Sequence, residues 1–365
     1  MTAQGFKHVG AILSRNFTLT SNVRSKSMKV TVFGAAGRTG SCLSLFLKQT
    51  SLIDELAIYD KVSVAPLALE LSHIDTKPRV THYESNEEGL KRTLDDTKIL
   101  VITAGEACDG KHSTNDAFMA NAKILMDLIP NVIKYCPTAL VALATSPMNQ
   151  LVPLIVEIYK KHGFYDYNRI FGITAINSMR ANKFAAEIIE FEPECVMVPV
   201  IGGNCCRTCV PVFSQMKPRC EFTHNWENFT RSSKEKGNSS LSMGFAAARF
   251  CISLCKALVG ERDVVEFAYT RSCVIPEVTY FAGPLELGPS GIQKYLGVPP
   301  LTNEECKNLE CAIPHLREAI TAGEALVLGP RQSSTETCPQ HPDICGQEIS
   351  GKMQKSDKFS QPCPI

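Results

Sequence analysis

A glycine-rich segment near the start of the chain constrains the fold more than any other feature. Residues 28–33 form an apolar, β-branched run that predicts a buried strand, and Gly34, Gly37 and Gly40 follow it. An apolar helical pattern comes next, and residues 56–60 predict a second strand that ends in an aspartate. Strand, glycine turn, helix, strand and acid in this order are typical of a dinucleotide-binding fold.

Each residue of this segment suggests its own task. Gly34 permits the tight turn, Gly37 lets the backbone approach a pyrophosphate, and Gly40 lets the helix pack on the strand. The helix N-terminus then faces the phosphates. Asp60 can bind a ribose diol and favours NAD over NADP, because its charge would repel a 2′-phosphate. Arg38 supports a rival interpretation, in which its side chain fills a decayed site and the turn only joins strand to helix.

Strands and helices continue to alternate along the first half of the chain. Residues 98–104 and 139–144 predict strands, and residues 114–135 and 150–162 predict helices. This alternation predicts an α/β fold with a doubly wound parallel sheet and ligands at the carboxyl ends of its strands. From about residue 165 glycines and prolines multiply, and long helices predict a second α+β lobe, with helices at 177–190, 240–259 and 302–323. We expect domains at 28–172 and 173–330.

Composition narrows the range of partners. The chain has 365 residues and a net charge of +1, so no basic excess points to nucleic acid. No run of about 18 apolar residues is apparent, so no membrane span is expected. Sixteen cysteines in a chain this long do not suggest a secreted disulfide scaffold. Most, such as Cys251, Cys255 and Cys273, are interpreted as small buried hydrophobes in a reducing compartment.

Both ends of the chain differ from the middle. Residues 1–27 carry basic and serine residues, and no Asp or Glu occurs before Asp54. This composition predicts a mitochondrial transit peptide and a place in the matrix, the alternative being a disordered basic N-terminus. Residues 331–365 predict a disordered tail. Its possible zinc ligands lack the close pairing of structural sites, so no metal site is expected; they are Cys338, His341, Cys345 and Cys363.

Several segments resemble the malate dehydrogenase family, specifically its mitochondrial-type branch. In family order over about 28–328, they read Val32-Phe-Gly-Ala-Ala-Gly37, Ala104-Gly105, Phe118 through Asn121-Ala122, Pro147-x-Asn149, Phe171-Gly-Ile-Thr174, Arg180-Ala-Asn182, Val198-Pro-Val-Ile-Gly-Gly203, Leu241-Ser-Met243, Ala248-Arg-Phe250 and Gly288-x-x-Gly291. The resemblance implies an NAD domain, a catalytic lobe, usually a homodimer, and oxidation of malate to oxaloacetate by hydride transfer to NAD. It implies cofactor contacts at Gly34, Gly37, Gly40, Asp60, Asn121 and Met243.

The catalytic pair of the family is altered in this chain. The resemblance places the family's general-base histidine at Asn204, and the aspartate that orients it at Asn177. An amide has no basic nitrogen near neutral pH, so it can form hydrogen bonds but cannot take up a proton. The sequence therefore predicts that malate dehydrogenase activity is lost or strongly reduced.

The family's substrate-binding positions are also changed. Its two loop arginines fall on Cys108 and Thr114, and the asparagine before a proline falls on Ser146, whereas Arg180 is retained. The resemblance implies that Arg180 holds the carboxylate at the reactive end of the substrate. The loop also gains Glu106 and Asp109, which would repel a dicarboxylate. A small dicarboxylic or 2-keto acid remains the expected substrate, if there is one.

Replacement residues in the same pocket raise the question of new chemistry. Cys206-x-x-Cys209 is the spacing of a redox pair or of half a metal site. The resemblance places it on an extended strand, where residues three apart face opposite sides, so small apolar substitutes are the favoured interpretation. Two less favoured hypotheses are that Cys108 is a reactive thiol and that His112 is a substitute base.

Three hypotheses about function remain open. The first is a non-catalytic malate dehydrogenase-like protein that keeps the dimer fold and NAD binding and has a structural or interaction role. The second is an active NAD-dependent (S)-malate dehydrogenase of the tricarboxylic acid cycle, or a dehydrogenase with an altered mechanism or substrate. The third hypothesis is a subunit that modulates an active paralogue. A homodimer, or a heterodimer with that paralogue, is the expected assembly.

Overall fold

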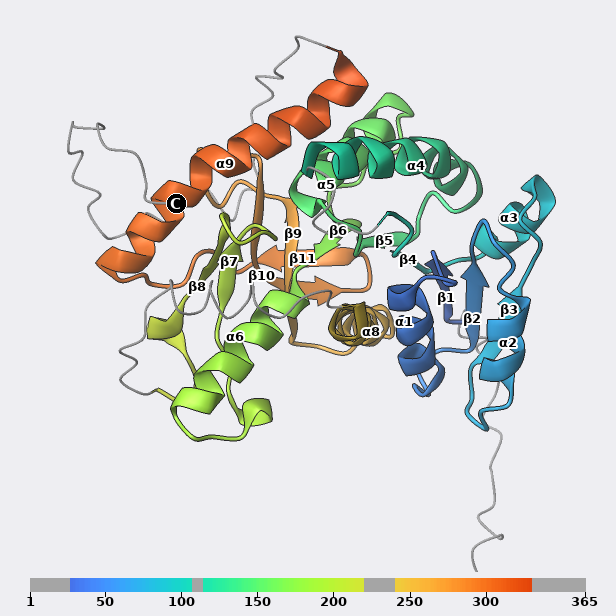
Figure 1. Ribbon diagram of the computed structural model, residues 1–365, viewed down its shortest axis with the longest axis horizontal. Helices are drawn as coiled ribbons and strands as arrows, with labels where there is room; N and C mark the ends of the chain where they lie inside the picture. The colour runs from blue at the N-terminus through green and yellow to red at the C-terminus, as the bar shows by residue number, and fades with distance from the viewer. Residues whose placement is uncertain (1–26, 107–113, 220–239, 330–365) are drawn as a thin grey trace, which may run out of the picture.

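A single sheet of eleven strands runs through the part of the chain that the structure describes. The computed structural model describes residues 27–106, 114–219 and 240–329. The strand order is β3-β2-β1-β4-β5-β6-β9-β10-β7-β8, and β11 pairs with β10 (Figure 1). The first six strands are parallel, as in a doubly wound dinucleotide-binding fold. The predicted fold class is confirmed.

The parallel half of the sheet contains every element that the sequence predicted for the first half of the chain. Its central strands are apolar because helices cover both faces of the sheet. Its elements are β1 (Lys29–Phe33), α1 (Arg38–Lys48), β2 (Glu55–Tyr59), α2 (Ala65–Ser72), β3 (Arg79–His82), α3 (Glu87–Leu94), β4 (Ile99–Ile102), α4 (Thr114–Tyr135), β5 (Leu140–Leu143), α5 (Met148–Lys161) and β6 (Ile170–Ile173). The short elements α2, β3 and α3, at the edge of the sheet, were not predicted from the sequence.

The second half of the chain extends the same sheet with antiparallel strands. β9 pairs with β6, and β10 joins β9 to β7. Its elements are α6 (Ala175–Ile188), η1 (Pro193–Cys195), β7 (Val200–Gly202), β8 (Cys209–Pro211), η2 (Phe213–Gln215), α8 (Ser240–Leu258), β9 (Val264–Arg271), β10 (Tyr280–Gly288), β11 (Gly291–Tyr295) and α9 (Asn303–Leu328). The three helices predicted for this half are present.

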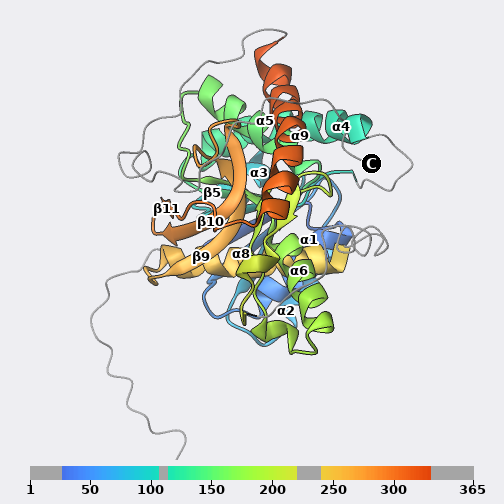
Figure 2. The same cartoon turned by 90° about the vertical axis from the view of Figure 1, so that its left-hand side faces the viewer.

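Helices cover the sheet on both sides. α4, α5 and α9 lie on one side, and α1, α8 and α6 lie on the other (Figures 1 and 2). α5 packs along α9, and α8 packs against both α1 and α6. The main hydrophobic core fills the layers between these helices and the sheet, and a smaller cluster lies under α6, β7 and β8. This second cluster supports the elements that carry the catalytic positions expected from the sequence.

Helix α8 corrects the expectation that no segment is apolar enough to cross a membrane. Within the described residues it passes that criterion on length and composition. It packs against α1, α6, β9 and β10, and Phe250, Cys251, Leu254 and Cys255 are fully buried. The hydropathy of α8 is explained by this position between other elements of the fold.

The cysteine interpretation is correct for some residues and wrong for another. Cys251 and Cys255 are fully buried in the core. Cys273 is half-buried in the segment after β9 and is disulfide-bonded, as is Cys311 on α9. Cys251 and Cys255 lie on the buried face of α8, whereas Cys273 lies outside the core in the segment after β9.

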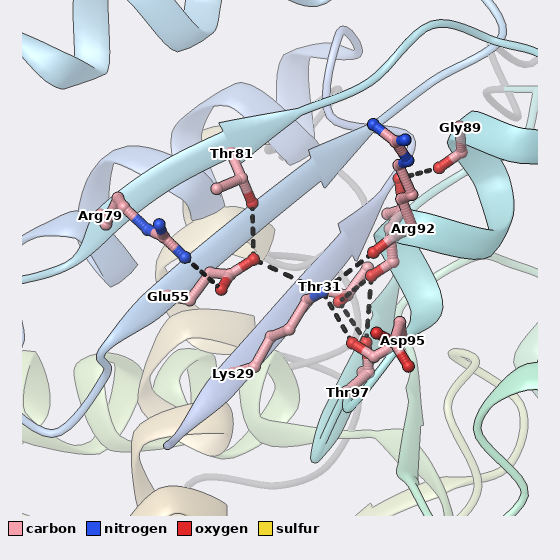
Figure 3. A network of polar contacts seen from close by, with 10 residues as sticks. Lys29, Thr31, Glu55, Arg79, Thr81, Gly89, Arg92, Asp95 and Thr97 are labelled. Carbon is pink, nitrogen blue, oxygen red and sulfur yellow. Dashed lines mark hydrogen bonds and ion pairs between the residues drawn. The ribbon is translucent and has the colours of Figure 1, made fainter.

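A polar network lies at the beginning of β1, at the end of the strand away from the glycine turn (Figure 3). Lys29 is buried and donates to the carbonyl oxygens of Arg92 and Asp95 over 3.1 and 2.7 Å. Its ammonium lies 3.4 Å from Glu55, which also accepts from Thr81 over 2.9 Å. The network therefore fixes α3 and β3 to the central strands by satisfying a buried charge.

Candidate functional site

The glycine turn leaves no space for side chains at two positions. Gly34 has a φ of 85°, and a Cβ atom there would lie 2.3 Å from the backbone nitrogen of Ala104. A Cβ atom at Gly40 would lie 2.1 Å from the carbonyl oxygen of Gly34. The backbone N–H groups of Gly34 and Ala35 donate to the carbonyl of Tyr59 over 3.0 and 3.2 Å. The turn is therefore fixed between β1, β2 and α1.

The N-terminus of α1 is open for a phosphate group. Gly37 is the N-cap residue, no side chain caps the helix, and the first turn holds no acidic residue. The unpaired N–H groups at such a terminus, with the helix dipole, attract anions. Arg38 is the first residue of the helix and is exposed, so its side chain does not fill the turn. These residues fit the pyrophosphate of a dinucleotide.

Asp60 lies directly beside this turn. It follows β2, and its carboxylate accepts from the backbone N–H groups of Ala36 and Lys61 over 3.0 and 2.7 Å. The side chain is half-buried, which leaves room for a further donor. The structure thus brings together Asp60 and the three glycines, and the arrangement suits a ribose hydroxyl beside the phosphate cradle.

Asn121 joins two loops at the carboxyl edge of the sheet. Its side chain is fully buried on α4, and its Oδ1 accepts from the backbone N–H of Glu106 over 2.6 Å. Its Nδ2 donates to the carbonyl oxygens of Ser146 and Glu106 over 2.7 and 3.2 Å. The amide of Asn121 is engaged by the protein itself, so its direct role is to hold the segments after β4 and β5 together. Ser146 is exposed beside it.

The remaining predicted ligand positions are spread around this edge. Met243 is half-buried in the first turn of α8. The next residue, Gly244, packs closely on α1, because a Cβ atom there would lie 2.9 Å from Cys42 Sγ. Thr114 is the exposed first residue of α4. Cys108 lies outside the described residues, as do Asp109, Lys111 and His112.

The two positions of the altered catalytic pair are in direct contact. Asn177 is buried on α6 and donates through Nδ2 to Oδ1 of Asn204 over 2.9 Å. Asn204 is half-buried and follows β7. Its backbone N–H donates to Oδ1 of Asn149 over 2.8 Å. The fold therefore holds these two amides together, but neither group can take up a proton near neutral pH.

The segment after Asn204 is a turn, which corrects the expectation of an extended strand. The carbonyl oxygen of Cys205 accepts from the backbone N–H groups of Thr208 and Cys209 over 3.0 and 2.9 Å. Cys206 is exposed, Cys209 is buried, and both are free thiols. The interpretation of these cysteines as small apolar substitutes fits Cys209, whereas Cys205 and Cys206 face solvent.

Thr208 contributes to the site in a way that was not predicted from the sequence. Its hydroxyl Oγ1 accepts from Nδ2 of Asn149 over 3.0 Å and lies 3.1 Å from Cys205 Sγ. Asn149, noted only as part of a motif, thus braces both Asn204 and Thr208 from α5. The sequence did contain one sign of this role, a threonine between two cysteines in a short polar segment. Such a hydroxyl needs a hydrogen-bond partner if it is buried.

Arg180 lies three residues after Asn177 on α6, so the two side chains share one face of the helix. The guanidinium is half-buried. Burial lowers the pKa of Arg180, and the nearby Cys209 opposes that shift. The guanidinium nevertheless stays charged, because an arginine side chain is not deprotonated in proteins. A partly desolvated guanidinium is suited to bind a carboxylate.

The comparisons with known proteins agree with this geometry. Residues 28–172 match the family described as lactate/malate dehydrogenase, NAD binding domain, and residues 174–327 match the lactate/malate dehydrogenase, alpha/beta C-terminal domain. The mitochondrial malate dehydrogenases of Rattus norvegicus and Homo sapiens are 37% identical over 87% of this chain and 96% of their own lengths. That of Caenorhabditis elegans is 35% identical over 84% of this chain and 92% of its own.

Solved structures show the same fold. Cryptosporidium parvum malate dehydrogenase superimposes with a TM-score of 0.68 at 21% identity, over 82% of this chain and 99% of its own. Lactate dehydrogenase from Eimeria maxima, solved with NADH and oxamate, superimposes with a TM-score of 0.69 at 20% identity. The match covers 87% of this chain and 99% of that one. With the glycine turn, the parallel sheet and both family regions in place, the chain belongs to the lactate/malate dehydrogenase family and carries its NAD-binding domain.

Proposed function

We propose that this protein binds NAD and a small 2-oxo or 2-hydroxy acid without the turnover of a working malate dehydrogenase. The observation that carries this proposal is the hydrogen bond between Asn177 and Asn204. It lies where the resemblance places the family's proton-transfer pair. The polar contact between the two positions is kept, but neither side chain can take the hydroxyl proton that leaves when a hydride is removed.

The expected loss of rate is large. A positioned general base contributes about 10²–10⁴-fold to a rate, and a preorganised charge at the transition state contributes about 10²–10³-fold. Such factors are not additive when the residues act as one unit. With Thr114 and Cys108 at the family's arginine positions as well, we expect malate oxidation at least about 10³-fold slower than in a working relative.

NAD binding is the part of the function that the chain's residues support best. Bound NAD would supply the hydride acceptor of the family reaction. In this chain, Asp60 would hold a ribose hydroxyl, and the uncapped N-terminus of α1 would hold the phosphates. We expect binding to be weaker than in active relatives, because the long side chain of Arg38 stands at the first position of α1, beside the expected phosphates, and Ser146 replaces the family's asparagine.

We further propose a mitochondrial protein that acts as a dimer. Mitochondrial relatives and the acid-free basic leader support the location. Apolar side chains on α1 and α8 support the dimer, because Leu45, Phe245 and Leu241 are 42%, 38% and 71% exposed. A second subunit covering these side chains would remove apolar surface from water. The partner is a second copy or an active paralogue.

The decisive experiment measures oxaloacetate reduction by NADH with the purified full-length protein. We expect a rate at least about 10³-fold below that of a mitochondrial malate dehydrogenase assayed in parallel. Calorimetric titration with NAD, in the same preparation, should show saturable binding. A rate within tenfold of the relative would overturn the proposal and would make the alternative, an active malate dehydrogenase with a substitute base, the better description.

The heterodimer has a separate test. The protein is mixed with an active mitochondrial malate dehydrogenase from the same cell, and the mixture is analysed by native mass spectrometry and by its rate. Mixed dimers with an altered rate per active subunit would favour a modulating subunit. Leu241→Glu should abolish those dimers, because it places a charge in the proposed apolar contact.

A further inference from the structure

Three thiols lie in the turn that follows the altered catalytic pair. Cys205 and Cys206 are exposed and Cys209 is buried, and all three are free. The sequence favoured an extended strand here, on which residues three apart face opposite sides. The structure has a turn instead, so that objection to a bond between cysteines no longer holds. The turn brings thiols from both of its ends together.

Cys205 and Cys209 form the base of this turn. The backbone N–H of Cys209 donates to the carbonyl oxygen of Cys205 over 2.9 Å. A hydrogen bond between residues four apart closes one helical turn and brings their Cα atoms to about 6 Å. Disulfide-bonded cysteines usually have Cα atoms about 4.4–6.8 Å apart. The backbone therefore already holds this pair within the span of a disulfide.

The sulfur of Cys205 lies against buried polar groups. Its Sγ atom is 3.1 Å from Thr208 Oγ1 and accepts from Asn149 Nδ2 over 3.8 Å. Thr208 and Asn149 are 1% and 6% exposed. Cys205 as a whole is exposed, so this residue connects solvent with the buried side of the turn.

Cys209 lies on that buried side. It is 3% exposed and belongs to the smaller core cluster under α6, β7 and β8. Burial raises the pKa of the Cys209 thiol, the charge of Cys205 raises it further, and the charge of Arg180 opposes both effects. The effect of Cys205 means that the two sulfur atoms are close enough to interact. The pair thus combines one thiol that a reagent can reach with one that it cannot.

We infer that Cys205 and Cys209 form a reversible disulfide by exchange with a small-molecule disulfide such as oxidised glutathione. The inference rests neither on NAD binding nor on the loss of turnover. The new bond draws the Cys205 sulfur away from Thr208 and Asn149. Because Asn149 also accepts from the backbone N–H of Asn204 over 2.8 Å, the exchange changes the hydrogen bonding directly beside the candidate site.

The exchange proceeds in two balanced steps. The thiolate of Cys205 attacks one sulfur of the small-molecule disulfide, whose S–S bond breaks, so that a mixed disulfide forms and one small thiolate leaves. Cys209 then loses its proton and attacks the Cys205 sulfur, and the second small thiolate leaves as the mixed disulfide breaks. The two cysteines lose two electrons and two protons, and the reagent is reduced to two thiols.

The test exposes the full-length protein to glutathione buffers with a rising proportion of the oxidised form. After acid quenching and alkylation, the disulfides are mapped by mass spectrometry. Trypsin cleaves after Arg207, so a bond between Cys205 and Cys209 joins two peptides that reduction separates. We expect the joined pair to become the main form of both peptides and dithiothreitol to reverse this. A mixed disulfide that persists at Cys205, or two cysteines that stay reduced, would overturn the inference.

Serine variants identify the two partners. Cys205→Ser and Cys209→Ser should each lose the joined pair. Cys206→Ser is the matched control and should keep it, because Cys206 is the exposed neighbour within the same turn. Thermal unfolding shows whether each variant is folded, and Cys209→Ala replaces Cys209→Ser if a hydroxyl in the core unfolds the protein. Loss of the joined pair in Cys206→Ser, or its retention in Cys205→Ser, would assign the bond to Cys206 and overturn the inference.

Discussion

The carboxylate of Asp60 accepts the backbone N–H of Ala36 over 3.0 Å, and so ties the end of β2 to the glycine turn after β1. Two segments separated by a helix are thereby brought to one point at the carboxyl edge of the sheet. This contact leaves the carboxylate half-buried. The hydrogen bond therefore holds the Asp60 carboxylate in position before any cofactor binds.

The first prediction follows from this contact. In Asp60→Ala, NAD should bind at least about tenfold more weakly, because a charge-assisted hydrogen bond is worth about 1.5–3 kcal/mol. Calorimetric titration measures the change. Glu70→Ala is the control, since Glu70 is an exposed acid on α2 and should leave the affinity unchanged. Equal affinities of Asp60→Ala and the wild type would show that NAD does not use this carboxylate.

The second prediction concerns stepwise recovery of catalysis. Asn204→His with Asn177→Asp should not recover malate dehydrogenase activity, because Glu106 and the altered loop still oppose a dicarboxylate. Adding arginines at positions 108 and 114, together with Ser146→Asn, should give a detectable rate. The measurement is steady-state oxaloacetate reduction, with thermal unfolding of each variant as the control. Full recovery by the first two changes alone would show that the loop is not limiting.

The third prediction tests the brace beneath the site. Asn149→Ala should destabilise the protein by about 1–3 kcal/mol, because it removes the acceptor of the Asn204 backbone N–H and one of the donors to the buried Thr208 hydroxyl. Urea unfolding followed by fluorescence measures the loss. Asn131→Ala is the matched control, since Asn131 donates over 3.0 Å to a carbonyl of its own helix at an exposed position. A loss no larger than that of the control would argue against the brace.

The fourth prediction is a pH dependence at the other end of β1. Burial raises the pKa of Glu55, but the hydrogen bond from Thr81, the charge of Lys29 and the contact with Arg79 outweigh it and leave the pKa below its usual value. Because the folded-state pKa is lowered, Glu55 stabilises the protein above the unfolded pKa, about 4.3. That contribution is lost as the pH falls through the folded-state pKa.

Thermal unfolding of Glu55→Gln and of the wild type over a range of pH tests this dependence of stability on pH. Near neutral pH the variant should be less stable than the wild type by up to about 1 kcal/mol. The difference should begin to shrink once the pH falls below the unfolded pKa of about 4.3 and should vanish below the folded-state pKa. Glu88→Gln provides the comparison, because Glu88 and its partner Arg92 are both 62% exposed and such pairs contribute little. A difference that grows on acidification would contradict the assignment.

Local patterns predicted the elements around the cofactor well. The run before Gly34 and the acid at residue 60 act through short-range geometry, so their order in the chain was enough to place them. The short edge elements were missed because β3 is only partly buried and its sequence has no clear alternation. An edge strand of this kind forms because it pairs with the neighbouring strand β2, and the sequence of β3 alone does not reveal that pairing.

The candidate site was predictable in position but not in detail. The resemblance placed Asn177 and Asn204 at the positions of the family's aspartate and histidine. Only the structure shows that the two amides are hydrogen-bonded to each other. The turn from Cys205 to Thr208 depends on a side-chain contact with α5 that residue spacing does not reveal. The disulfide bonding of Cys273 depends in the same way on tertiary proximity. Such contacts between distant segments decide the chemistry of a pocket.

The pairing of β6 with β9 has a mechanical consequence. Gly172 and Ile173, at the end of the first family region, are joined by the sheet to Tyr269 and Ala268 in the second. The two family regions therefore share one continuous hydrogen-bonded sheet, so that a movement of one region against the other would have to bend or break its ladder. The sheet thereby sets the distance between the glycine turn after β1 and the segment after β7 that carries Asn204. The two amides at positions 177 and 204 are thus held on a frame that does not depend on their own chemistry.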